Sequence, residues 1–199
     1  MMLVEQTPVP AAALPVAQFK DHLRLGSGFA DDGVQDGLLE AQLRAALAAI
    51  EARTGKVLLS RVFTWTLSGW RDFGRQALPV APVTQITEVR LVDRQGVASV
   101  IDADRYVLER DGQRPRLVST GLSLPLVPVS GSVEIHFVAG YADAWGGLPA
   151  DLGQAVFLLA AHYYERRVAE PGPAARMPFD VSILIDRYRT VRLFGEGGR

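Results

Sequence analysis

The clearest pairing of residues that could do chemistry is a histidine and a carboxylate on one predicted helix, His162 and Glu165. Residues at i and i+3 share a helix face, and such a pair can hold half of a di-metal carboxylate site. That site needs a second histidine–carboxylate pair, and the sequence offers none, since His22 and His136 are equally isolated. The spacing favours a structural histidine, and we predict no metal site.

Two glycine-containing segments resemble nucleotide-binding loops only in part. Thr54-Gly55-Lys56 has Ile50 and Val57 where a phosphate loop needs a glycine and a serine or threonine. Gly26-Ser27-Gly28 lacks the third glycine of a dinucleotide fingerprint and follows no predicted strand. The first segment is typical of a helix end and the second of a turn, so we predict no nucleotide cofactor.

A nucleophilic serine would need a base and an oxyanion site. No Gly-x-Ser-x-Gly segment occurs, and the nearest run, 121–125, has proline at its last position and indicates a loop. Neither this run nor the histidines suggest a catalytic centre. We therefore expect no catalytic residue and no enzymatic activity.

Aromatic and basic side chains at 65–75 could form a stacking surface for nucleic-acid bases; they are Trp65, Trp70, Phe73, Arg71 and Arg75. A dedicated nucleic-acid binder has a strong basic footprint. This chain balances 21 basic against 22 acidic residues, for a net charge of −1. Aromatic residues on a sheet are more often part of a core or an interface, and that interpretation is favoured here.

Composition is that of an ordinary globular protein of one domain, or of one domain with an insertion. Hydrophobic residues make up 48% and charged residues 22% of 199 residues, enough for a sizeable core. Cysteine is absent, which excludes disulfides and thiolate metal sites. The first residues lack a signal-peptide pattern, and the longest apolar stretch, 155–161, is too short to span a bilayer. We expect a protein that is cytosolic where it is made.

Helical periodicity appears in four places, three of them before residue 170 and one in the C-terminal segment. Residues 1–14 indicate an extended arm, after which Pro15 can begin a helix with Val16, Phe19 and Leu23 on one face. A long helix follows, capped by Asp31 or Asp32 and ended by Gly55. Its apolar face is formed by Leu39, Leu43, Ala46 and Ile50. A third helix over 150–167 is apolar nearly all round, which is typical of a buried central helix.

Period-two patterns predict strands between the second and third helices. They cover 59–67, 86–92, 106–109, 116–118 and 133–138, separated by segments rich in Gly, Asp and Ser. We predict an α+β fold: a helical bundle at 15–56 and 141–170 with an antiparallel β unit, 57–140, inserted between helices that contact each other.

The C-terminal segment, 171–199, begins with the breaker Pro171-Gly172-Pro173. Asp180 can cap a short helix in which Val181, Leu184, Ile185 and Tyr188 form one stripe. A free segment of this composition would expose a large apolar patch. It either folds back on its own bundle or docks on another subunit, and the residues alone do not decide between the two.

In three places the chain resembles the head–tail connector proteins of tailed bacteriophages and gene transfer agents. The likeness lies in the opening helix 16–25 with the long helix 38–53; in Phe137-Val138-Ala139-Gly140-Tyr141 with the helix after Leu148; and in the terminal segment 183–193. Their order frames nearly the whole chain. The β unit is the part least tied to the family.

This resemblance implies a structural adaptor that forms a ring of typically about twelve copies beneath the portal. The implied partners are the portal protein, neighbouring copies and a tail or stopper protein. DNA is only passing cargo, no membrane is involved, and the final location is the neck of the particle. The implied portal-docking residues are Phe179, Val181, Leu184, Ile185, Tyr188, Arg189, Val191, Arg192 and Leu193. Two alternatives stay open: a small enzyme with the β unit as substrate domain, and a β-type binding module.

Overall fold

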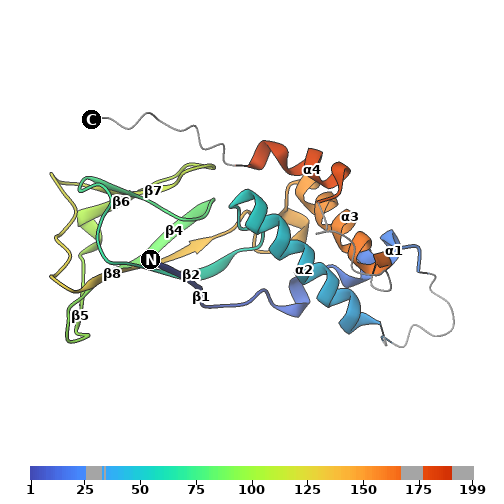
Figure 1. Cartoon of the computed structure of the whole chain (residues 1–199), viewed down its shortest axis with the longest axis horizontal. Helices are drawn as coiled ribbons and strands as arrows, with labels where there is room; N and C mark the ends of the chain where they lie inside the picture. Colours follow the sequence, from blue (N-terminus) through green and yellow to red (C-terminus); the bar gives the residue numbers. More distant parts are fainter. Residues whose placement is uncertain (26–32, 34, 167–176, 190–199) are drawn as a thin grey trace.

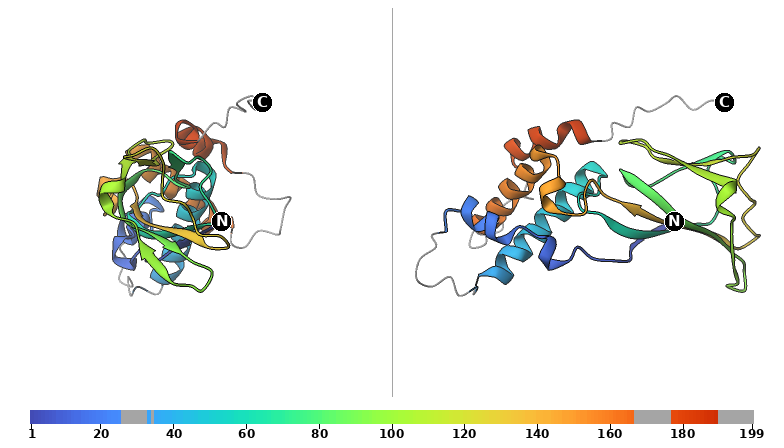
Figure 2. Two further views of the ribbon diagram at one scale, coloured as in Figure 1. Left: turned by 90° about the vertical axis from the view of Figure 1, so that its left-hand side faces the viewer. Right: turned by 180° about the vertical axis from the view of Figure 1, so that it is seen from behind.

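The computed structural model describes residues 1–25, 33, 35–166 and 177–189. The molecule is elongated, with the helices at one end and the strands at the other (Figures 1 and 2). Both helices and antiparallel sheets are present, so the predicted α+β class is confirmed.

Four α-helices form the helical end. They are α1 (Val16–His22), α2 (Asp36–Thr54), α3 (Ala150–Arg166) and α4 (Phe179–Ile185), and one-turn 3-10 helices lie at Ala11–Ala13, Ala103–Arg105, Trp145–Gly147 and Asp186–Tyr188. As predicted, Gly55 ends α2: its φ of 69° is left-handed, and its amide donates to the carbonyl of Glu51. The predicted caps Asp31 and Asp32 lie outside the described residues; Gln35 precedes the helix.

Helices α2 and α3 pack against each other, and α4 packs on α3, so the predicted contact between 38–53 and 150–167 is confirmed. Their shared core is built by fully buried side chains of each helix: Phe19, Leu39, Leu43, Ile50, Leu152, Val156, Leu159, Val181 and Ile185. None of the helices in the described ranges is long and apolar enough to cross a membrane.

The larger sheet has five antiparallel strands in the order β1-β2-β8-β4-β5. They are β1 (Met2–Glu5), β2 (Arg61–Leu67), β8 (Ser132–Ala139), β4 (Val83–Val92) and β5 (Ala98–Val100). Strand β8 is central and alternates strictly, with one face buried at Val133, Ile135 and Phe137. The N-terminal segment, predicted only to be extended, supplies the edge strand β1 beside β2.

A smaller antiparallel sheet has the order β3-β7-β6, from β3 (Arg75–Ala77), β7 (Arg116–Ser119) and β6 (Tyr106–Glu109). Its Leu117 is fully buried and belongs to the same hydrophobic cluster as residues of the larger sheet. Two of these, Phe63 and Phe137, have stacked rings with centroids 5.7 Å apart. The two sheets thus enclose a second hydrophobic core, separate from that of the helices.

The chain passes from the sheet to α3 at Gly140, where the backbone is tightly packed. A Cβ on this residue would lie 2.4 Å from the Cα of Ser60, and its φ is 150°. The Gly140 amide donates to Pro82, and the next amide, of Tyr141, donates to Leu58. Only glycine fits here, so this junction holds β8 against the segment that leads out of α2.

Candidate functional site in the C-terminal helix and the helix–sheet junction

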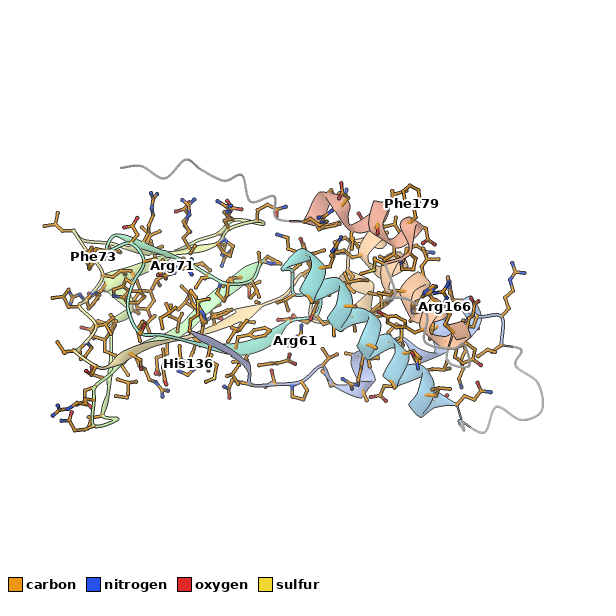
Figure 3. All side chains as sticks on the ribbon, in the orientation of Figure 1. Arg61, Arg71, Phe73, His136, Arg166 and Phe179 are labelled. Atoms are coloured by element: carbon orange, nitrogen blue, oxygen red, sulfur yellow. The ribbon has the colours of Figure 1, made fainter. Side chains whose placement is uncertain are left out.

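The apolar residues of α4 divide between two faces. Val181 and Ile185 are fully buried against the helical core, and Tyr188 after the helix is nearly so. Phe179 and Ile183 point the other way and are 81% and 61% exposed. Figure 3 shows Phe179 on the outer side of the helical end. One face of this short helix therefore stabilises the subunit and the other is open to a partner.

The predicted docking residues fall into three groups. Val181, Ile185 and Tyr188 contact the chain's own core, and Leu184 is partly buried beside them. Phe179 and Arg189 are exposed, and Arg189 pairs with Asp186 at 3.1 Å. Val191, Arg192 and Leu193 lie outside the described residues. Docking of these residues on a portal stays a prediction, and the three buried side chains are not available at the surface for it.

Tyr188 fastens the end of α4 to the start of α3. Its hydroxyl donates to Asp151 Oδ1 at 2.8 Å, and Arg187 Nη2 lies 2.7 Å from Asp151 Oδ2. Arg187 also donates to the Tyr188 hydroxyl, and its guanidinium lies over the ring, 4.7 Å from the centroid. Asp151 is in the first turn of α3, where the helix dipole favours a negative charge.

Tyr141 completes this contact from the β8–α3 junction. Its ring meets that of Tyr188 edge to face, with centroids 5.9 Å apart. Burial, helped by the neighbouring Tyr188, raises the pKa of Tyr141 to about 12. The phenol therefore stays neutral at physiological pH. The aromatic pair links the junction, α3 and the C-terminal segment.

We predict that Tyr188→Phe will lower the free energy of unfolding by about 1–2 kcal/mol. The substitution keeps the ring and its packing but removes the hydroxyl that Asp151 accepts from. Urea denaturation followed by circular dichroism measures the loss, with an unchanged m-value because the same surface is buried. An unaltered midpoint would mean that the hydroxyl gains no more from Asp151 in the folded chain than from water in the unfolded chain.

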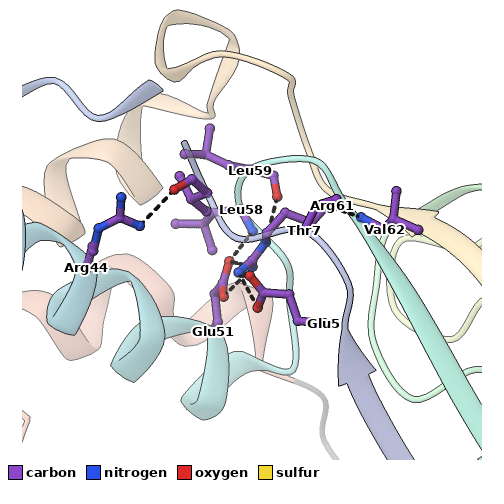
Figure 4. Close-up of polar contacts among 9 residues, drawn as sticks. Glu5, Thr7, Arg44, Glu51, Leu58, Leu59, Arg61 and Val62 are labelled. Carbon is purple, nitrogen blue, oxygen red and sulfur yellow. Dashed lines mark hydrogen bonds and ion pairs between the residues drawn. The ribbon is translucent and has the colours of Figure 1, made fainter. Parts of the chain in front are cut away.

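A partly buried ion-pair network joins the helices to the larger sheet (Figure 4). Arg61, at the start of β2, contacts both oxygens of Glu51 on α2, at 2.5 and 2.6 Å, and Glu5 on β1 at 2.9 Å. Glu51 also accepts from the backbone amide of Leu58 at 2.8 Å. Burial raises the pKa of Glu51, and the Arg61 guanidinium opposes that rise. The guanidinium of Arg61 thus joins the end of α2 to β2 and both to the N-terminal strand β1, which is 56 residues away in sequence.

The residues first considered for chemistry do not form a reaction centre in the described part of the chain. His162 and Glu165 line an open cavity of about 420 Å³ together with His22, Arg24 and Asp180. No group of three or more possible metal ligands is found among the described residues. The Nε2 atom of His162 is buried and has no hydrogen-bond partner among the described residues. The cavity thus has acids and bases but no assembled metal or nucleophile site.

The aromatic residues at 65–75 do not form a stacking surface. Trp65 is buried in the β core, and the Trp70 indole donates to the carbonyl of Pro125 at 2.7 Å. Phe73 is the exposed one of the three aromatic residues, and Arg75 pairs with Asp72. The core accounts for Trp65, as the sequence favoured, and a contact between loops accounts for Trp70, whereas Phe73 stays at the surface.

Sequence reasoning missed a set of exposed apolar side chains in the loop before β8, namely Leu122, Leu126 and Val129. The amide of Leu124 in this loop donates to the carbonyl of Phe73, whose side chain is exposed as well. The analysis of 121–125 considered only a serine nucleophile. A signal was present, because no charged residue occurs in 117–133.

The chain is similar over its full length to solved components of a particle neck. It is 53% identical, with a TM-score of 0.90, to a chain in the neck of an empty gene transfer agent particle computed with C6 symmetry, and covers 100% of both chains. It is 54% identical, with a TM-score of 0.87 and 98% coverage of both, to a chain in the virion of a native gene transfer agent particle. The neck of the native particle, computed with C12 symmetry, contains a chain that is 50% identical, with a TM-score of 0.85 and 100% coverage of both. No family model and no curated protein matches.

Proposed function

The chain belongs to the head–tail connector proteins of tailed bacteriophages and gene transfer agents, and on that premise we propose that it joins the capsid to the tail as a ring beneath the portal. Its solved relatives are structural components of a particle neck and not enzymes. The single observation that carries the proposal is the identity of 53% and 50% over the full length to two chains in the necks of gene transfer agent particles. The subunit would be made in the bacterial cytoplasm and end in the neck.

We propose a ring of twelve copies around a channel for DNA. The C12 and C6 symmetries of the relatives' necks support a cyclic assembly. Such a ring uses heterologous contacts, so each subunit offers two different patches to its neighbours. A net charge of −1 suits a channel through which DNA slides, because weak attraction to phosphates does not hold the cargo.

We propose different roles for the two ends of the molecule. The helices of 15–56 and 141–170 would act as a bundle that faces the portal, and the β unit of 57–140 would extend from it. Helices α2, α3 and α4 share one core, whereas the sheets enclose another, which supports this division. Strand β1 and the Arg61 network would keep the two parts in a fixed orientation.

For portal docking we propose the outer face of α4 together with the segment that follows it. Phe179 supplies an exposed apolar side chain, and Val191 and Leu193 are apolar residues further along. Arg189 and Arg192 can pair with acidic groups on the portal. The buried Val181, Ile185 and Tyr188 would act indirectly, by positioning α4 so that these residues reach the partner.

Removing residues 190–199 tests this proposal. We expect the 1–189 chain to keep its melting temperature, because the buried residues of α4 and Tyr188 remain. Mixed with purified portal, the full chain should form a complex by light scattering and the shortened chain should not. The Phe179→Ser variant of the full chain should bind the portal more weakly, again without a change in melting temperature.

The Val107→Ser variant is a suitable control, because Val107 is an exposed apolar residue on the smaller sheet. It should bind the portal as the unaltered chain does. Normal portal binding by the 1–189 chain would show that residues 190–199 are not needed for docking. That result would not contradict the connector function. No complex between the full chain and the portal would contradict the connector function itself.

A further inference from the structure

The end of the β part presents a set of exposed apolar side chains that folding leaves uncovered. Leu122 is fully exposed, Val129 is 91% and Leu126 is 76% exposed, and Phe73 is 65% exposed. We call these four residues the β tip. Single exposed apolar residues are ordinary, but a group of large ones on one end of a protein is typical of an interaction site.

The β tip is held in place by specific contacts of its loop. Leu124 is buried in the β core, and its amide donates to the carbonyl of Phe73 at 2.6 Å. The Trp70 indole donates to Pro125, one residue further on, at 2.7 Å. These contacts join the loop 120–131 to the loop of Phe73. Leu124 points inward, whereas Leu122 and Leu126 are exposed. The loop therefore does not have strand geometry, in which residues at i and i±2 would share one face.

Restraints on the backbone also hold the β tip in place. Pro125 and Pro128 restrict the loop, and the end of the loop closely approaches β4: a Cβ on Gly131 would lie 2.3 Å from the carbonyl oxygen of Val92. A surface that is ordered before binding loses less conformational entropy when a partner arrives. The β tip is therefore prepared for binding a protein surface.

Charge identifies the chemical class of the partner. No charged residue occurs in 117–133, although 22% of the chain is charged. Such a loop has none of the Lys and Arg side chains that provide the electrostatic attraction to nucleic-acid phosphates. The cores of protein–protein interfaces, in contrast, are depleted in charge and rich in apolar side chains. The fitting partner is a protein with an uncharged, apolar groove.

Position in the molecule selects among the protein partners. Phe73 and Phe179 lie at opposite ends of the long axis (Figure 3), and the loop 120–131 forms the end where Phe73 lies (Figure 1). A connector must meet a different component on each side. If α4 faces the portal, the β tip is at the other end of the subunit, away from that contact. In that orientation, neighbouring copies related by rotation about the ring would meet along the flanks of the subunit and not at this end.

We propose that the β tip is the docking surface for the next protein on the tail side of the neck, a component that presents an uncharged apolar groove. This inference rests on the proposed function and adds to it the residues that make the second contact. With α4 at one end and the β tip at the other, one subunit would bridge the two components directly.

The experiment uses particles assembled with the triple variant Leu122→Ser/Leu126→Ser/Val129→Ser. All three side chains are exposed, so the purified variant should keep its melting temperature and its binding to the portal. In producing cells we expect DNA-filled heads that still contain the variant but carry at least about tenfold fewer tails, a change equivalent to only about 1.4 kcal/mol. Electron microscopy counts the tails, and immunoblotting of purified heads measures the connector.

Val107→Ser again provides the control and should give a normal proportion of tailed particles. Normal tailing by the triple variant would overturn the proposal. So would loss of the triple variant from heads, which would assign the β tip to the portal or to a second copy of the chain. If the unaltered chain itself failed to bind the portal, the proposed function would fail, and that result is distinct from either outcome for the β tip.

Discussion

Replacing Ile185 with alanine should lower the free energy of unfolding by about 2–5 kcal/mol. The same substitution at Ile183 should change it by less than about 0.5 kcal/mol. Both isoleucines are in α4, but Ile185 is 1% exposed within the helical core and Ile183 is 61% exposed. The pair therefore separates burial from helix propensity, because the chemical change and the helix are identical.

Thermal denaturation is a direct measurement of this difference. For a chain of this size, 1 kcal/mol shifts the melting temperature by roughly 2–4 °C, so the Ile185→Ala variant should melt clearly earlier than Ile183→Ala. Deleting 178–199 should destabilise the subunit further, since Val181 and Tyr188 are lost as well. Equal melting temperatures for the two alanine variants would show that α4 does not pack on α3 in solution.

For the C-terminal segment, the sequence predicted which side chains share a helix face but not which surface that face contacts. Spacing at i, i+3, i+4 and i+7 predicted one stripe of four residues, Val181, Leu184, Ile185 and Tyr188, and in the structure all four pack on the helical core, Leu184 only partly buried. The same spacing is compatible with packing on the chain itself or on a partner, because a helical stripe does not specify the surface it meets. The apolar face of α3, which covers these residues, decides the matter, and that contact exists only in the folded chain.

Strands were predictable where several alternating residues pack on a core, as in β2 and β8. Three strands were not predicted, because β3 and β5 have only three residues each and β1 depends on a partner strand far along the chain. A short segment acquires strand geometry from the hydrogen bonds of its neighbour, and propensity carries little of that information.

The β tip was missed for a related reason. Leu122, Leu124 and Leu126 alternate as in a strand, but Pro125 excludes a regular one, so the segment was predicted only to be a loop. Loops are generally polar at the surface, and nothing in the local sequence shows that Leu124 alone would be buried. The contact of this loop with Trp70 and Phe73 determines which side chains remain outside.

The remaining large effect concerns Arg61, whose side chain is only 9% exposed between Glu51 and Glu5. Removing one partner of a buried ion pair leaves the other charge without compensation, so we expect Arg61→Met to cost about 3–5 kcal/mol. Burial already raises the pKa of Glu51, and without the guanidinium the carboxyl would be protonated more readily. Arg75→Met, which breaks a solvent-exposed pair with Asp72, should leave the melting temperature unchanged.

Adding Glu51→Gln to Arg61→Met should restore part of the lost stability, because the neutral amide needs no countercharge and can still accept from the Leu58 amide. Urea denaturation of the two single variants and the double variant gives the coupling energy between the residues. Additive losses would mean that Arg61 acts only through packing, for example on the ring of Phe63. A strong coupling would support the view that this pair fixes the sheets relative to the helices, and a connector that transmits position from portal to tail needs that orientation to be fixed.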